Sequence, residues 1–230
     1  MATQSTFVTD MLRKRALLTP DKTALVDRID GSEITFREWD ARVNQTAVYL
    51  RALGVGKGDL VAVYSSNRAE YLDLFWAAGR IGAVLQNLNW RLTVHELAGI
   101  IADAEPMMLI YSPDWAENVE ELRPGLTTVK HVVALEDPAP GELDFAERDE
   151  QPADPVDRPD LDLDDAWGIY YTGGTTGLPK GAILTHGNVT WNSVNTITSW
   201  GIHAGHVAAL QLPFFHVGGP NIFMVPLVHV

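Results

Sequence analysis

A twelve-residue stretch combines side chains that are suited to binding phosphate. It reads Tyr170-Tyr-Thr-Gly-Gly-Thr-Thr-Gly-Leu-Pro-Lys-Gly181. Glycines let the backbone adopt positive φ and approach a bulky anion, and successive loop N–H groups form a concave nest for phosphate oxygens. Threonine hydroxyls add donors, and Lys180 adds a compact positive charge. The stretch is not a Walker A loop, because Lys180 follows a proline and precedes a glycine.

A histidine farther along the chain is the second candidate for chemistry. His216 lies in Pro213-Phe-Phe-His-Val-Gly-Gly219. Taken singly, each segment has a plainer interpretation. A glycine-rich stretch between two strands is most often an ordinary hairpin loop, and an isolated histidine at a strand end is most often a structural residue with its hydrogen bonds satisfied.

Both segments, in this order, resemble the adenylate-forming superfamily of acyl-CoA synthetases, aryl-CoA ligases, luciferases and peptide-synthetase adenylation domains. The family's phosphate-binding signature is Tyr-Thr-Ser-Gly-Thr-Thr-Gly-x-Pro-Lys-Gly, and here Gly173 takes the place of its serine. Ala77-Ala-Gly-Arg-Ile-Gly-Ala83 and Asn89-Trp-Arg-Leu-Thr93 resemble earlier segments of the same family. We interpret those two segments as structural. For Arg91 the alternatives are a contact with a partner strand or with a CoA phosphate, and a surface or capping role, which we favour.

The resemblance implies an enzyme that uses ATP and Mg²⁺ to convert a fatty or aryl carboxylic acid into an acyl-adenylate, with release of pyrophosphate. CoA then takes the acyl group as a thioester, which is the chemistry of an acid–thiol ligase in fatty acid metabolism. His216 is expected near the reacting carboxylate, and no metal ligand is assigned. The residues expected to bind the β- and γ-phosphates are Thr172, Gly173, Gly174, Thr175, Thr176, Gly177 and Lys180.

Two other functions stay open. One is a family member whose second half-reaction is not thioester formation, and the other is a non-catalytic regulatory or dimerising domain that keeps the fold. A homodimer is a further option. The apolar segment 224–230 has no closing turn or polar tail, so we expect this chain to be an N-terminal portion of a longer protein and to be inactive alone.

The elements that must position these residues follow an α/β pattern. Thr35 with Glu38, and Thr93 with Glu96, match the capping box that begins a helix. Helical spacing of apolar residues after each cap, and again over 71–81, alternates with short apolar strands, which indicates a parallel sheet with flanking helices. The expected strands are 60–64, 83–88, 107–111, 131–135, 167–172, 182–185 and 207–212, with further helices near 114–122 and over 188–200.

The composition is that of an ordinary globular protein. The chain has 230 residues, 46% of them hydrophobic, and contains no cysteine, which excludes disulfides and thiolate metal sites. The sequence has no apolar run long enough for a transmembrane helix and no signal peptide. We therefore expect a cytoplasmic protein.

The net charge of −13 is concentrated in one segment. Most of the excess acidic residues, together with several prolines, lie between residues 136 and 165. This pattern predicts a solvated connection, and the absence of a basic patch argues against nucleic acid as a partner. The chain is thus divided into a first α/β half (1–135), the acidic Pro-rich connection (136–165) and a phosphate-loop half (166–230).

Overall fold

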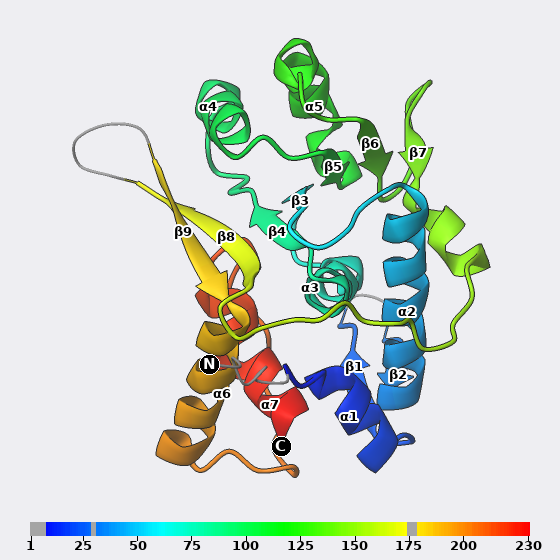
Figure 1. Ribbon diagram of the computed structural model, residues 1–230, viewed down its shortest axis with the longest axis vertical. Helices are drawn as coiled ribbons and strands as arrows, with labels where there is room; N and C mark the ends of the chain where they lie inside the picture. The colour runs from blue at the N-terminus through cyan, green and yellow to red at the C-terminus, as the bar shows by residue number, and fades with distance from the viewer. Residues whose placement is uncertain (1–7, 29–30, 174–178) are drawn as a thin grey trace, which may run out of the picture.

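The computed structural model describes residues 8–28, 31–173 and 179–230, and a seven-stranded sheet forms the centre of that described part (Figure 1). Neighbouring strands run parallel except the last pair, which is antiparallel. The α/β fold with a parallel sheet and flanking helices is therefore confirmed. From one edge to the other, the strands are β7 (Leu143–Asp144), β6 (His131–Ala134), β5 (Met108–Tyr111), β3 (Leu60–Tyr64), β4 (Val84–Asn87), β8 (Ala166–Thr172) and β9 (Lys180–Thr185).

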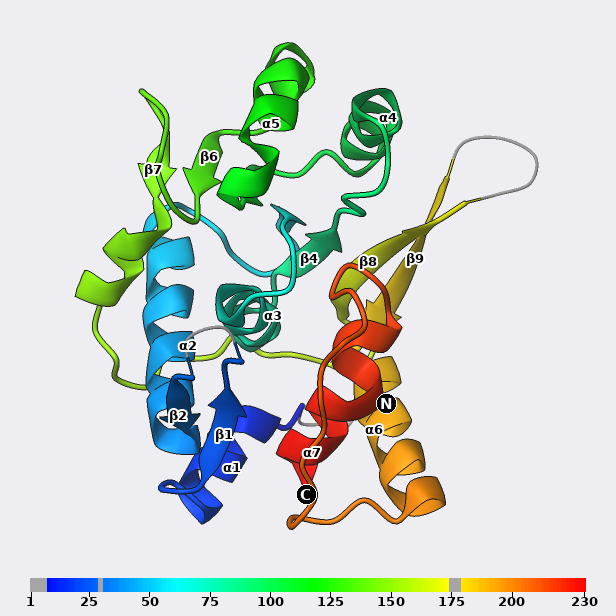
Figure 2. The same ribbon diagram turned by 180° about the vertical axis from the view of Figure 1, so that it is seen from behind.

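Helices cover both faces of the sheet. Successive strand residues point to opposite faces, so Val61 and Val63 join one apolar cluster while Ala62 and Tyr64 join another. Helices α2 and α3 pack on the first face and α4 and α5 on the second (Figure 2). The helices are α1 (Met11–Leu18), α2 (Phe36–Ala52), α3 (Ala69–Ile81), α4 (Val94–Ala104), α5 (Ala116–Leu122), α6 (His186–Trp200) and α7 (Val225–His229).

Shorter elements complete the described part. Strands β1 (Thr23–Val26) and β2 (Glu33–Thr35) form a separate antiparallel pair. The segment that precedes α7, Pro220–Met224, is a π-helical turn. Short 3₁₀ helices span Pro113–Trp115, Arg123–Gly125 and Phe145–Glu150.

Both capping boxes anticipated from the sequence are present. The Glu38 N–H donates to Thr35 Oγ1 (3.3 Å) and the Thr35 N–H donates to Glu38 Oε2 (2.7 Å). Thr93 and Glu96 make the same reciprocal pair at the start of α4. A third box, with Asn188 as the partner of the cap residue, begins α6 two residues earlier than the sequence suggested. The asparagine amide oxygen there accepts the hydrogen bond that a glutamate accepts in the other two.

The prediction of a strand at 207–212 is wrong. This segment has no regular secondary structure, and Val207 is 93% exposed. An apolar run can extend, but a strand also needs a neighbour that takes up its N–H and C=O groups. The sheets of the described residues contain no strand paired with 207–212.

The acidic connection is not simply a solvated linker. Phe145, Arg148 and Leu161 within it are buried, and Arg148 Nη1 lies 2.5 Å from Asp73 Oδ2 on α3. Its backbone carbonyls also accept hydrogen bonds from α2 side chains, such as that of Asn44. The sequence interpretation weighed charge and proline content, whereas a few anchoring side chains hold the segment against the helices. The division at 135 and 166 itself stays a prediction, and strands from both sides of it, β4 and β8, pair directly.

Candidate functional site

Strand β8 enters the sheet beside β4 and then leaves it with β9 as a two-stranded hairpin. Its pairing with β4 ends at Tyr170, opposite Asn87, whereas its pairing with β9 continues to Thr172, opposite Lys180. Figures 1 and 2 show this β8–β9 hairpin projecting from the body of the molecule. Thr172 and Lys180 of the predicted phosphate-binding stretch therefore lie on an extension beyond the parallel sheet.

The described residues at the hairpin end are exposed and polar. Thr172, Gly173 and Lys180 are all exposed, and the Thr172 hydroxyl lies 3.4 Å from the Lys180 carbonyl oxygen. Among the described residues, no carboxylate forms an ion pair with Lys180, so its charge is available to an external anion. The other four predicted phosphate ligands, Gly174, Thr175, Thr176 and Gly177, lie outside the described residues.

Two glycines of the stretch differ in what surrounds them. A Cβ at Gly181 would lie 2.5 Å from Ile169 Cδ1 and 3.2 Å from Tyr171 Cζ, so any other residue at this position would displace the Ile169 side chain. A Cβ at Gly173 would have no described heavy atom within 4 Å. The backbone at 173 can therefore carry the serine of the family signature, and its replacement by glycine removes a hydroxyl without relieving a clash.

The segment around His216 is fixed by three neighbouring elements. Asn67, just after β3, donates to the Leu212 carbonyl (2.8 Å) and accepts from the Phe214 N–H (2.9 Å). Phe214 packs edge-on against Tyr71 of α3, and Phe215 packs edge-on against Trp90, which follows β4. These contacts hold the segment near the carboxyl ends of β3 and β4. In open α/β sheets, ligands bind at that edge.

The ring of His216 is exposed, and its hydrogen bonding determines its neutral tautomer. The Gly218 N–H donates to His216 Nδ1 (3.1 Å), so Nδ1 is an acceptor and the proton of the neutral ring resides on Nε2. The Nε2–H is then free to donate to an anion from outside. The turn that presents the ring depends on Gly219, because a Cβ there would lie 2.3 Å from the Pro213 carbonyl oxygen.

Arg91 lies beside the same aromatic residues, which the sequence interpretation had not anticipated. Its guanidinium carbon is 5.0 Å from the Trp90 ring centroid and 5.9 Å from that of Phe215. These are cation–π distances. Arg91 has no carboxylate partner among the described side chains. The structure thus places an unpaired cation against the aromatic residue that precedes His216, and the sequence carried no periodic signal for it.

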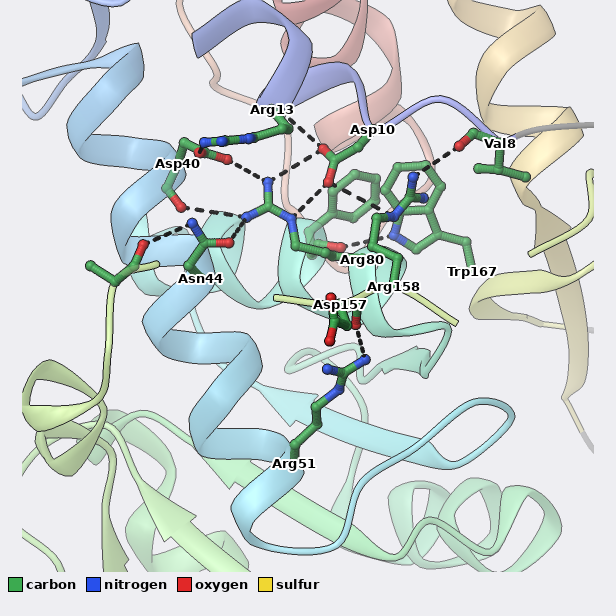
Figure 3. Close-up of polar contacts among 12 residues, drawn as sticks. Val8, Asp10, Arg13, Asp40, Asn44, Arg51, Arg80, Asp157, Arg158 and Trp167 are labelled. Atoms are coloured by element: carbon green, nitrogen blue, oxygen red, sulfur yellow. Dashed lines mark hydrogen bonds and ion pairs between the residues drawn. The ribbon is translucent and has the colours of Figure 1, made fainter. Parts of the chain in front are cut away.

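A second polar group, which we call the Arg80 cluster (Asp10, Arg13, Asp40, Asn44 and Arg80), is internally paired, and Asp40, Asn44 and Arg80 within it are buried (Figure 3). Arg80 lies 2.8 Å from Asp10 and 2.6 Å from Asp40, and it donates to Asn44 Oδ1 at 2.5 Å. Burial alone would lower the pKa of Arg80, but Asp10 and Asp40 raise it. The cluster joins the N-terminal segment to α2 and α3, which agrees with a structural role for the Ala77–Ala83 motif.

His186 is a buried histidine that sequence reasoning did not select. It is 1% exposed, its ring stacks on Trp167 at 4.8 Å, and neither ring nitrogen has a partner among the described residues. Burial, with a further contribution from the charge of Arg158, lowers its pKa to about 4. His186 is therefore neutral at physiological pH and lies within the core rather than at the hairpin end.

The described residues contain no group of three or more histidine, aspartate or glutamate side chains arranged to hold a metal ion. They also contain no helix that is long and apolar enough to cross a membrane. Among the described residues at the hairpin end, the side-chain donors are the Thr172 hydroxyl and the Lys180 ammonium group. Such donors match phosphate oxygens rather than a cation.

Comparison with known proteins gives consistent matches along almost the whole chain. The sequence model of a family described as AMP-binding enzyme matches residues 12–229. A feruloyl-CoA synthase from an Amycolatopsis species is 40% identical over 213 residues, covering 93% of this chain and 40% of that protein. A long-chain-fatty-acid–CoA ligase from Thermus thermophilus is 36% identical over 214 residues, covering 90% and 39%.

Solved structures agree with these sequence matches. The anthranilate CoA ligase AuaEII, in complex with anthranoyl-AMP, superposes with a TM-score of 0.84 at 25% identity. That match covers 97% of this chain and 43% of the other. The chain therefore spans about 40% of the length of the relatives it matches.

Proposed function

This chain belongs to the AMP-binding enzyme family, and we propose that it supplies the phosphate-binding hairpin and the acid-positioning histidine of an ATP-dependent acid–CoA ligase. The observation that carries the proposal is the hairpin end, where Thr172 and Lys180 are exposed and Lys180 lacks an acidic partner among the described residues. The names of the relatives, a feruloyl-CoA synthase and a long-chain-fatty-acid–CoA ligase, support the reaction class.

The proposed reaction begins with acid activation. A carboxylate oxygen attacks the α-phosphorus of ATP, the bond to the bridging oxygen breaks, and pyrophosphate leaves. Lys180 and the Thr172 hydroxyl bind oxygens of the β- and γ-phosphates, together with Gly173, Gly174, Thr175, Thr176 and Gly177. Hydrogen-bond donors at these positions stabilise the negative charge that develops on the leaving pyrophosphate. A Mg²⁺ ion bound to the nucleotide would supply further positive charge to the same phosphates.

His216 is proposed to orient the acid. Its Nδ1 already accepts a hydrogen bond from the Gly218 N–H, so the Nε2–H is the donor that meets a carboxylate oxygen. Phe215 and Trp90 provide an apolar aromatic surface beside the histidine. This surface suits a fatty or aryl acid, and the anthranoyl-AMP complex of a structural neighbour is consistent with an aryl acyl-adenylate. In the second half-reaction, the thiol of CoA attacks the acyl carbon and AMP leaves.

The phosphate role is tested with Lys180→Ala in the full-length protein. A hydrogen bond to a charged group contributes roughly 1.5–3 kcal/mol, so the apparent affinity for ATP should fall about ten- to hundredfold. The KM for the acid should stay within about twofold. Lys130→Ala, which removes an exposed lysine before β6, is the matched control. Unchanged ATP kinetics in Lys180→Ala would remove the hairpin from the phosphate site.

The acid role is tested with His216→Ala. Acid-dependent exchange of labelled pyrophosphate into ATP should slow or change its acid preference, while ATP binding is retained. His216→Gln keeps an N–H donor and should recover part of the rate, and His95→Ala controls for loss of an exposed histidine. A wild-type protein that binds ATP but exchanges pyrophosphate with no fatty, aryl or short acid would instead favour a non-catalytic domain that retains the fold.

The proposal carries two further expectations. A cytoplasmic location is proposed, since ATP and CoA, the proposed co-substrates, are both present there. Residues 1–230 alone are expected to be inactive, because a partial set of catalytic groups loses most of the advantage of holding the reactants together. A homodimer stays a prediction that size measurements on the full-length protein would check.

A further inference from the structure

The end of the β8–β9 hairpin needs an anchor other than the sheet. Beyond Tyr170, strand β8 pairs with β9 but not with β4. Isolated two-stranded hairpins are marginally stable in water. The positions of Thr172 and Lys180 therefore depend on whatever ties this extension to the body of the protein.

One side-chain contact provides such a tie. The Tyr171 hydroxyl donates to Asp103 Oδ2 at 2.5 Å, a distance typical of a hydroxyl bonded to a charged carboxylate. Asp103 lies near the end of α4, which is fixed in the core by Leu97, Ile100 and Ile101. Asp103 makes no ion pair with a described lysine or arginine, so Tyr171 is its partner.

The ring of Tyr171 also contacts β9, the strand that begins at Lys180. Tyr171 is directly opposite Gly181 in the hairpin register, and a Cβ at Gly181 would lie 3.2 Å from the ring carbon Cζ. The ring therefore rests over the residue that follows Lys180. Burial and the Asp103 carboxylate raise the pKa of Tyr171, which keeps its hydroxyl protonated as a donor.

We propose that Asp103 is a positioning residue for nucleotide binding, which it supports by holding Tyr171 and thereby the Thr172 and Lys180 ends of the hairpin. This inference rests on the proposed phosphate role of those two residues. Asp103 itself touches no phosphate in this scheme. Asp103 affects ATP binding only through the Tyr171 hydroxyl, so removing either Asp103 or that hydroxyl should weaken ATP binding equally.

The test measures MgATP binding and hydrogen–deuterium exchange in the full-length protein. Tyr171→Phe and Asp103→Ala should each weaken ATP binding about tenfold, and the double variant should be no weaker than either single one. Asp103→Asn keeps an acceptor for the hydroxyl and should lie closer to wild type. Backbone amides of 171–173 and 179–181 should exchange faster in the first two variants. The KM for the acid should change less than twofold.

Tyr49→Phe is the matched control, because it also removes a tyrosine hydroxyl that bonds another element, the Asp144 carbonyl at 3.3 Å. It should leave both ATP binding and hairpin exchange unchanged. If the wild-type protein binds ATP and Tyr171→Phe binds it equally well, the inference is overturned and the proposed function stays intact. Faster exchange without weaker ATP binding would also overturn it. A wild-type protein that binds no ATP would overturn the proposed function together with the inference.

Discussion

The Arg80 cluster and the β8–β9 hairpin both contain charged residues within segments that resemble family motifs, yet their surroundings are opposite. Arg80 has a side chain that is 2% exposed and is paired with Asp10 and Asp40. Lys180 is exposed and lacks a described acidic partner. In the first region, the polar groups satisfy one another and join α1, α2 and α3. In the second, no described carboxylate neutralises the charge of Lys180, which fits the proposed role of the hairpin in binding phosphate. Pairing with neighbouring charges, rather than likeness to a family motif, therefore separates the two regions.

The largest expected effect comes from breaking the buried cluster. Arg80→Met leaves Asp10 and Asp40 without their main partner, and removing one member of a buried ion pair costs about 3–5 kcal/mol. Urea unfolding of this chain should show that loss. Arg37→Met, which breaks the exposed pair with Asp21, should cost at most about 1 kcal/mol. Equal losses in the two variants would contradict the distinction between the regions.

A smaller effect should follow from acidification, through His186. Its folded-state pKa of about 4 is below the ordinary value of 6.5, so between these values the unfolded chain binds a proton that the folded chain does not. The stabilising contribution is complete above pH 6.5 and is lost as the pH falls toward 4. Between pH 7.5 and 5.0 the loss should be about 2 kcal/mol.

The measurement is urea unfolding at both pH values, in wild type and in His186→Phe. The variant lacks the titrating ring, so the difference in pH dependence between the two proteins isolates the contribution of His186. Identical pH dependence in both would mean that the histidine is not buried in its neutral form.

Glycine substitutions compare packing at two helix positions. A Cβ at Gly79 of α3 would lie 2.3 Å from Trp167 Cε2, so Gly79→Ala should destabilise the protein by about 1–3 kcal/mol. A Cβ at Gly99 of α4 would meet no packing neighbour within 4 Å, so Gly99→Ala should stabilise by about 0.5–1 kcal/mol. Thermal or urea unfolding measures whether each substitution raises or lowers the free energy of unfolding. If Gly79→Ala stabilised the protein, Trp167 would have to be free to move.

The smallest effect is expected at the hairpin end. Gly173→Ser should change the free energy of unfolding by no more than about 0.5 kcal/mol, because no described atom occupies the space of its side chain. Urea unfolding of the variant and of wild type makes the comparison. A loss above about 1 kcal/mol would mean that position 173 is packed and that the hairpin end resembles the scaffold more than an open binding region.

Much of the fold was readable from local pattern. The capping pairs at Thr35 and Thr93 begin the helices where expected, and short apolar runs predicted every strand between Leu60 and Thr185 except β7. The failures have a common cause. The segment 207–212 is apolar but has no described partner strand, and the acidic connection is anchored by the distant Asp73. The local sequence pattern does not show whether a segment will have a pairing strand or a distant anchoring residue.

The sequence by itself determined the chemical character of the protein: a Gly, Thr and Lys stretch suited to phosphate, a downstream histidine, and an alternation of strands and helices. These depend on residue type and spacing along the chain. Only the tertiary structure decided that Asn67 holds the segment before His216, that Arg91 lies against Phe215, and that Tyr171 bonds Asp103. Hydrogen bonds and ring contacts act over a few ångströms, so they depend on which distant segments the fold brings together.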